Sequence, residues 1–362
     1  MKNRYIFLLL FVLFFISTRS GFSQENDITK YFKNFSINAY IDTYYSIDND
    51  KSAGSNPRMF DLLSPYRDQI SLNIAQLSLK YKDEKIRGTF TMHFGDIPDV
   101  NWGPVTKTKY VQEANVGFSP VENLWIDGGY FLTHIGAESF PRFNFFSSFA
   151  LPVNYEPFLQ SGLKIGYSFS DKFNASLYAL NGFNMFEDNN KNKSAGMQLN
   201  YTPLPELNII YNNILGNEQP TGIQGKTRVL NNLIFNVYPM KKLDIVASAD
   251  YGLQEKSSLS DSLKTAYYYG ASIAGRYRFS PNYSASIRGD FFQDLDCVVS
   301  SPLNNGRGVK ANSLSLGFEY KPVEKAYVRF EYRYVIMDGE QTIFEDNSNT
   351  RSEATITLGF EY

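Results

Sequence analysis

The last stretch of the sequence, residues 352–362 (SEATITLGFEY), places the strongest constraint on the fold. The even-numbered positions from Ala354 to Tyr362 are apolar or aromatic, whereas the odd-numbered positions from Glu353 to Glu361 are polar or small. This period of two is typical of a β-strand with one apolar and one polar face. An apolar strand at the end of a soluble domain would leave an adhesive edge. A closed membrane barrel removes that edge by pairing the last strand with the first.

The same alternation recurs along the whole chain and predicts sixteen strands. The second segment changes phase halfway along, which predicts a β-bulge near Ala75. The last strand is expected to pair with the first, with Phe35 and Ile37 close to Phe360 and Tyr362. The predicted strands are 34–47, 69–82, 85–96, 109–118, 123–133, 158–169, 173–182, 194–202, 206–215, 227–238, 242–252, 265–279, 282–293, 310–320, 325–337 and 352–362.

The connections between these segments alternate between short and long, which is the pattern of an outer-membrane barrel. The short ones are two to four residues and aromatic side chains cluster beside them, as expected at a membrane interface. The predicted fold is therefore all-β: a transmembrane antiparallel up-and-down β-barrel of about 16 strands with short periplasmic turns and long external loops. The long loops are 48–68, 97–108, 134–157, 183–193, 216–226, 253–264, 294–309 and 338–351.

The first residues carry the features of a secretory signal peptide. Lys2 and Arg4 precede an apolar run over 5–16, and small residues follow up to Ser23. That run is too short to span a bilayer as a helix, which favours a signal peptide over the alternative, a short membrane anchor. We predict a signal peptide at 1–23, a short periplasmic segment at 24–33 and an outer-membrane barrel at 34–362. The single cysteine, Cys297, excludes an internal disulfide.

Composition agrees with a barrel whose strands face lipid on one side and water on the other. The chain is 43% hydrophobic and 16% aromatic, yet its mean hydropathy is only −0.32. The formal net charge of −2 gives no sign of a nucleic-acid partner. We expect the protein in the bacterial outer membrane, with outer-membrane lipid, small hydrophilic solutes and the barrel-assembly machinery as partners. Homotrimers are common among sixteen-stranded porins, so the fold analogy favours a homotrimer.

A barrel of sixteen strands leaves an aqueous lumen, so passive diffusion of small hydrophilic solutes is the expected function. Inward arginines on one wall can attract anions, or they can simply pair with acids on neighbouring strands. The alternation places Leu358 on the lipid face and Thr357 on the lumen face. Leu358→Arg should therefore lower the free energy of unfolding by about 2–4 kcal/mol, whereas Thr357→Arg should be tolerated. The pore-lining candidates are Arg276, Arg278, Arg288, Arg329, Arg333, Asp42, Glu113, Asp250, Asp290 and Glu331.

The long loop 134–157 is rich in phenylalanine for an exposed connection, and large apolar side chains need cover. It can fold inward against the wall and narrow the pore, or it can form a compact external cap. The residues expected to constrict the pore in the first case are Glu138, Phe140, Arg142, Phe143, Phe145 and Phe146.

Other functions find less support in the sequence. The only histidines, His93 and His134, lack the context of a hydrolytic triad, so an outer-membrane hydrolase is disfavoured and we expect no enzyme activity. No catalytic residues, cofactor or metal ligands are predicted. A non-conducting barrel that acts as a surface receptor or structural protein is the alternative to a porin.

Most of the chain after the predicted signal peptide resembles a known family, and the resemblance is sharpest over about residues 127–203. The run from Asp127 to Glu138, the Asn144–Ser147 segment, the Pro157–Gly162 segment and the Asn-Gly pair at 181–182 are similar to the OmpL-like β-barrel porins. This resemblance implies an outer-membrane pore but no particular substrate. The terminal aromatic of the last strand also resembles the assembly signal of outer-membrane barrels, with Tyr362 in place of the more usual phenylalanine.

Overall fold

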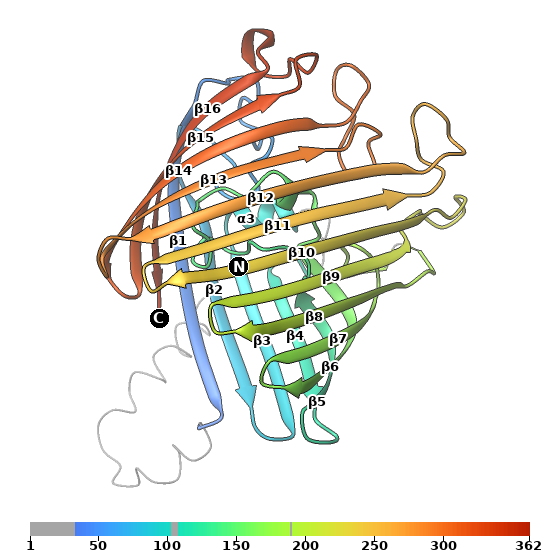
Figure 1. The fold of residues 1–362 in the computed structure, drawn as a ribbon, viewed down its shortest axis with the longest axis vertical. Coiled ribbons are helices and arrows are strands. Elements are labelled where there is room, and N and C mark those ends of the chain that lie inside the picture. Colours follow the sequence, from blue (N-terminus) through green and yellow to red (C-terminus); the bar gives the residue numbers. More distant parts are fainter. Residues whose placement is uncertain (1–32, 103–107, 189) are drawn as a thin grey trace, which may run out of the picture. The chain divides into compact units, whose positions relative to one another are not determined.

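The barrel predicted from the alternating pattern is present in the structure. The computed structural model describes residues 33–102, 108–188 and 190–362, of which 36–362 form one compact unit. The expected signal peptide and nearly all of the 24–33 segment lie outside the described residues. Within those residues, sixteen antiparallel strands close into a single barrel in which strands adjacent in sequence pair (Figure 1). The predicted fold class is thereby confirmed.

The observed strands end within a few residues of the predicted bounds. None of the helices among the described residues is long and apolar enough to cross a membrane. Among the described residues, three short helices lie in the long loops: α3 (Asp96–Asn101), η2 (Pro152–Tyr155) and η3 (Glu345–Asn347). The strands are β1 (Phe35–Asp48), β2 (Ile70–Lys82), β3 (Ile86–Phe94), β4 (Val111–Phe118), β5 (Leu124–Leu132), β6 (Leu159–Ser170), β7 (Phe173–Leu180), β8 (Ser194–Leu204), β9 (Leu207–Asn217), β10 (Thr227–Met240), β11 (Leu243–Gln254), β12 (Ala266–Arg278), β13 (Tyr283–Gln293), β14 (Lys310–Val323), β15 (Ala326–Met337) and β16 (Thr350–Glu361).

The two faces of the wall differ as the alternation predicts. On β16, Ile356, Leu358 and Phe360 are exposed on the outside, whereas Thr355 and Thr357 are buried inside. Exposed aromatic side chains form a belt near each end of the strands, as expected for the two interfaces of a membrane. The belt near the short turns includes Phe118, Phe169, Tyr201, Phe279 and Tyr283, and the belt near the long loops includes Tyr45, Phe94, Tyr110, Tyr251 and Tyr267.

The first and last strands close the barrel, but their register differs from the prediction. Ile41, not Phe35 or Ile37, lies opposite Phe360, and the backbones of Ala39 and Tyr362 exchange two hydrogen bonds. Closure of a tilted barrel requires its strands to be staggered, so two strand ends cannot be aligned by their aromatic residues alone.

Irregularities in the strands move some side chains to the other face. On β2 the exposed residues change from Ile70 and Leu72 to Leu77 and Leu79, a change of phase at the predicted place. A second shift, between β3 and β4, was not predicted. It turns Gln112 inward, where the side chain is buried and accepts a hydrogen bond from Gln76 (2.8 Å).

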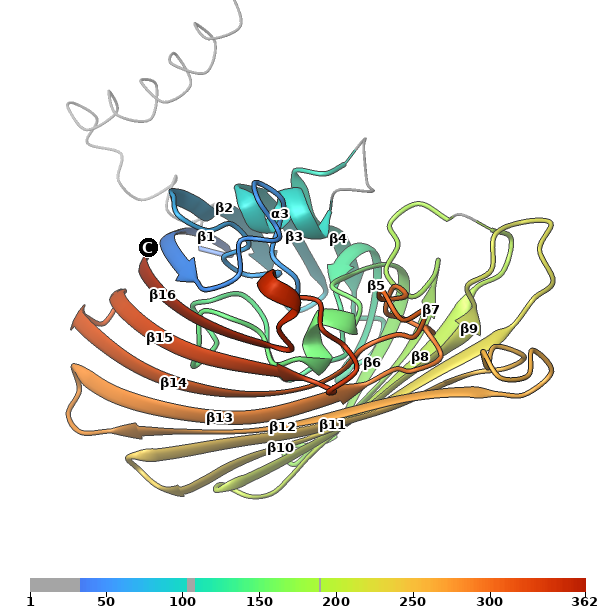
Figure 2. The same cartoon turned by 90° about the horizontal axis from the view of Figure 1, so that it is seen from above.

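The interior of the barrel is packed with side chains from the wall and from long loops. Figure 2 shows loops lying within the ring of strands, among them the green segment that follows β5. Apolar side chains of the wall, such as Ile214, Leu230 and Tyr268, form one cluster with Phe60 and Leu151 of two loops. The interior is therefore a partly filled lumen whose loops decide which parts stay open.

Candidate functional site in the lumen

The loop 134–157 is held against the inner face of the wall. The backbone N–H groups of Ser147 and Ser148 donate to Oε2 of Glu331 on β15 (2.7 and 2.9 Å). The N–H of Leu151 donates to Asp290 on β13 (2.9 Å), and the Ser147 hydroxyl bonds that of Thr357 on β16 (3.0 Å). Carboxylates that accept backbone N–H groups in a buried place fix a loop strongly. The loop is docked on β13–β16.

Arg288 on β13 is the central anchor of this contact, and its side chain is fully buried. The guanidinium pairs with Glu138 of the loop (2.9 Å), with Asp290 (3.1 Å) and with Glu331 (3.7 Å). It also donates to the backbone carbonyls of Ser148 (2.9 Å) and Phe149 (3.2 Å). Burial raises the pKa of the Glu138 carboxyl, and the charge of Arg288 opposes that shift.

Arg329 on β15 makes a second anchor beside the first. Its guanidinium pairs with Glu319 on β14 (2.7 Å) and donates to the carbonyls of Pro141 and Phe146 (3.0 Å each). The Phe146 ring is fully buried and packs over Gly317, where an added Cβ would lie 3.1 Å from the ring. The absence of a side chain at Gly317 on β14 thus lets the loop approach the inner face of the wall closely.

The beginning of the loop is attached to a different part of the wall. His134 contacts the carbonyl oxygen of Asn213 on β9 (2.9 Å), and its burial lowers the pKa of the imidazole, so the ring is neutral. The N–H of Gly136 donates to Asn232 on β10 (3.3 Å). Since 147–151 bind β13–β16, the loop runs across the lumen between two walls.

The end of the loop contains a buried acid. Burial raises the pKa of Glu156 well above its usual value, and Asp250 on β11 and Glu138 add to this shift. Gly136 has a left-handed backbone (φ 96°), and a Cβ there would overlap the Glu156 carboxyl. The two ends of the loop therefore pack on each other through a glycine and a buried acid whose pKa is raised.

A second loop, 49–69, also folds inward, and the sequence analysis missed it. Asp61 pairs with Arg351 on β16 (2.6 Å) and with Arg333 on β15 (3.4 Å), while Arg58 pairs with Glu353 (3.3 Å). The apolar residues Met59, Phe60, Leu62 and Leu63 carry the same signal as the phenylalanines of loop 134–157, because large apolar side chains in an exposed connection need cover.

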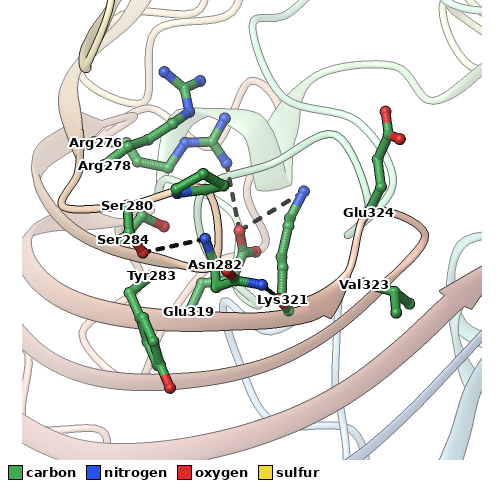
Figure 3. A pocket seen from close by; sticks show the side chains of 11 residues that line it. Arg276, Arg278, Ser280, Asn282, Tyr283, Ser284, Glu319, Lys321, Val323 and Glu324 are labelled. Atoms are coloured by element: carbon green, nitrogen blue, oxygen red, sulfur yellow. Dashed lines mark hydrogen bonds and ion pairs between the residues drawn. The ribbon is translucent and has the colours of Figure 1, made fainter.

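The predicted pore-lining residues fall into two groups. Arg288, Arg329, Arg333, Asp290 and Glu331 are buried beneath the two inward loops. Arg276 and Arg278 border a cavity of about 410 Å³ near the short turns (Figure 3). Both pair with Asp244, and Arg276 also pairs with Glu319. Of the other candidates, Asp42 accepts hydrogen bonds from Tyr327 and Asn73, Asp250 accepts one from Asn232, and Glu113 borders a second cavity.

The predicted constriction residues are likewise divided. Glu138, Phe140 and Phe146 are inside the packed interior, and Phe145 stacks under the guanidinium of Arg276 (4.3 Å). Arg142 lies over the ring of Tyr40 (4.5 Å), and Phe143, 63% exposed, projects into open space. The loop thus presents one cationic and two aromatic side chains to the open part of the lumen.

The structure corrects the expectation that an arginine is tolerated at position 357 on the inner face of β16. Thr357 is fully buried under the Ser147 hydroxyl, so an arginine at this position would collide with the docked loop. The expectation that Thr357→Arg is tolerated is wrong, because the lumen is filled here.

The chain can now be compared with known proteins. Residues 34–362 match the family described as "Putative beta-barrel porin-2, OmpL-like". The chain belongs to this family. Among proteins of curated function, no sequence matches it.

Solved structures share the barrel of this porin-family chain at low identity. The anion-selective porin from Comamonas acidovorans has 8% identity and a TM-score of 0.63, over 91% of this chain and 99% of that one. The trimer form of OmpT, an outer membrane protein of Vibrio cholerae, has 14% identity and a TM-score of 0.59 over the same shares. OmpF of Salmonella typhi, in complex with daunomycin, has 11% identity and a TM-score of 0.59, over 91% and 97%. These likenesses show the fold.

The histidines of this porin-family barrel serve packing. His93 bonds the carbonyl of Lys109 (3.0 Å) and meets the edge of Trp102, and His134 stacks on Tyr178 (4.0 Å between ring centroids). In the part of the chain that the structure describes, no group of three or more His, Cys, Asp or Glu residues is placed to hold a metal ion.

Proposed function

We propose that the protein is a bacterial outer-membrane porin through which small hydrophilic solutes diffuse passively, and that loop 134–157 narrows its pore. One observation carries the proposal: a loop fixed across a sixteen-stranded lumen by buried ion pairs leaves open cavities beside it. The cavity of about 410 Å³ near the short turns and the second, of about 300 Å³, are both lined by charged and polar side chains together with apolar ones. A large barrel with a polar remaining lumen is suited to diffusion.

The docking of the loop favours a fixed constriction over a moving gate. Arg288 donates to loop carbonyls, and Asp290 and Glu331 accept hydrogen bonds from loop N–H groups, so lifting the loop would take buried partners from all three side chains. Removing one member of a buried charge network is costly. A steady pore of reduced width is the expected behaviour.

The cellular setting follows the same proposal. Residues 1–23 direct export, the barrel-assembly machinery inserts the chain, and the exposed apolar belt contacts outer-membrane lipid. A homotrimer fits the fold analogy with the trimer form of OmpT. Mobility on a native gel before and after boiling tests it: a heat-labile band of three times the subunit mass is expected, and a single monomer band contradicts it.

Conductance separates a porin from its alternative, a non-conducting barrel that serves as a surface receptor, and transport of this kind requires no catalysis. The purified chain is reconstituted in planar bilayers, and single-channel current and the reversal potential in a salt gradient are recorded. Arg276→Gln with Arg278→Gln is the informative variant, because both side chains border open space and neither contacts the loop backbone. We expect steady channels whose preference shifts toward cations in the double variant. The absence of channels would contradict the porin function.

A further inference from the structure

Three cavities lie in sequence along one side of the lumen. An outer cavity of about 500 Å³, near the long loops, shares Asn101 and Phe158 with a small cavity of about 110 Å³. That small cavity shares Leu132 and Phe140 with the cavity of about 300 Å³ near the short turns. The shared residues place the three spaces next to one another in a row, with the small cavity, called the neck below, in the middle.

The lining of the neck differs from the lining of the cavities on either side. Eight large apolar side chains surround it: Leu63, Ile97, Trp102, Leu132, Ile135, Phe140, Phe149 and Phe158. The outer cavity carries Glu156, Arg228 and asparagines, and the inner one carries Lys80, Glu113, Arg142 and Glu361. The inner space thus holds charges of both signs and the outer one a guanidinium, a buried acid and amides beside apolar side chains, whereas the neck is mainly hydrocarbon.

The neck carries no free charge among the described residues. Its one ionisable lining residue is Glu138, whose carboxylate is taken up by Arg288 (2.9 Å) and by the N–H of Ala150 (2.7 Å). A hydrated inorganic ion that enters such a passage loses water contacts and gains no charged partner. A solute with an apolar ring exchanges water for contact with aromatic side chains, which is favourable.

Building on the proposed porin function, we propose that this neck is a selectivity filter for small solutes that combine polar groups with an apolar ring. The polar cavities accept the charged or hydroxylated end of such a solute, and the neck accepts its ring. Inorganic ions and fully polar solutes of the same size pass more slowly. The barrel then conducts less current than a sixteen-stranded lumen without the neck.

The test compares two zwitterionic amino acids of similar size, phenylalanine and glutamine, which differ in the ring. Swelling rates of liposomes containing the full chain are measured for each, with single-channel current in KCl. We expect phenylalanine to enter several times faster than glutamine, and Leu132→Asn to bring the two rates to within about twofold and to raise the KCl current. Phe158→Ser, at the outer mouth of the neck, is the second variant and should act in the same direction. Leu263→Asn, in an exposed loop, is the matched control and should change neither quantity.

Two results would overturn the proposal, and they differ in what else they overturn. Equal entry of phenylalanine and glutamine into wild-type liposomes that swell and conduct, or a rate ratio unchanged in both neck variants, removes the filter and leaves the porin standing. No swelling and no current with folded wild-type protein removes the porin function and the filter together.

Discussion

Two long loops on the same side of the barrel have opposite fates. In loop 134–157 the large apolar residues Phe146, Phe149 and Leu151 are buried, whereas in loop 255–265 Leu259 and Leu263 are 57% and 82% exposed. Apolar content alone therefore does not bring a loop into the lumen. The difference lies in the polar partners that each loop finds.

The inward loop is held by charges of the wall, whereas the outward loop is held by its own neighbours. Glu331 and Arg288 bind backbone groups of loop 134–157 deep in the barrel. The N–H of Leu259 instead donates to Asp296 of the adjacent long loop (2.9 Å). Buried backbone groups need partners, so a loop enters the lumen only where the wall supplies them.

Of the predicted changes, Arg288→Met should have the largest effect, because it breaks the buried network that holds the inward loop. The change leaves the buried carboxylates of Glu138, Asp290 and Glu331 without their shared cation, so we expect a loss of about 3–5 kcal/mol in the free energy of unfolding. Arg278→Met is the matched control, because that side chain is 37% exposed and its ion pair is worth only about 0–1 kcal/mol. Urea unfolding of the detergent-folded barrel, followed by tryptophan fluorescence, measures both. Equal losses would mean that the buried network does not hold the interior.

The next effect concerns the outer face. Leu358→Arg places a charge on the lipid side of β16 and should cost about 2–4 kcal/mol. Leu263→Arg, in the exposed loop, should leave the free energy of unfolding unchanged within about 0.5 kcal/mol. Equilibrium folding into lipid vesicles gives both values. A cost at position 358 no greater than at 263 would contradict the membrane-facing assignment of the wall.

The smallest effect should come from pH and act through Glu156. The pKa of Glu156 is raised in the folded state, so its neutral carboxyl contributes to the free energy of unfolding. This contribution is at its full size when the pH is below the ordinary pKa of glutamate. That contribution is lost as pH rises through the raised value, because the ionised group would face Asp250 and Glu138. Unfolding midpoints should therefore fall with rising pH in the wild type, and Glu156→Gln should flatten the dependence. An identical pH profile in both proteins would exclude this role for the acid.

Most of the wall could be predicted from the sequence because a period of two is enforced at nearly every position. Lipid on one side and polar contacts on the other leave little freedom in the choice of side chain. The prediction failed where the backbone departs from that period. Gln112, a polar residue at a position that the alternation assigns to the outer face, is turned inward by a shift in pairing, and the stagger of β1 against β16 depends on the whole barrel.

The interior could be predicted only in part. The phenylalanines of loop 134–157 indicated that the loop needed cover, but inward and outward packing satisfied that need equally well. The direction depends on partners distant in sequence, such as Ser147 with Glu331 and Asp61 with Arg351. The inward arginines were open to two interpretations for the same reason: buried pairing of Arg288 and Arg329 appears only when the loop is in place.

The most direct test of the central claim is the single-channel conductance after removal of the inward loop. Deletion of residues 139–150 takes away the docked part of loop 134–157, and deletion of 256–263 from the exposed loop is the matched control. If the inward loop constricts a water-filled pore, the first deletion should raise the conductance severalfold and the second should leave it unchanged. An unchanged conductance after deletion of 139–150, in a variant that still folds into membranes, would contradict the account.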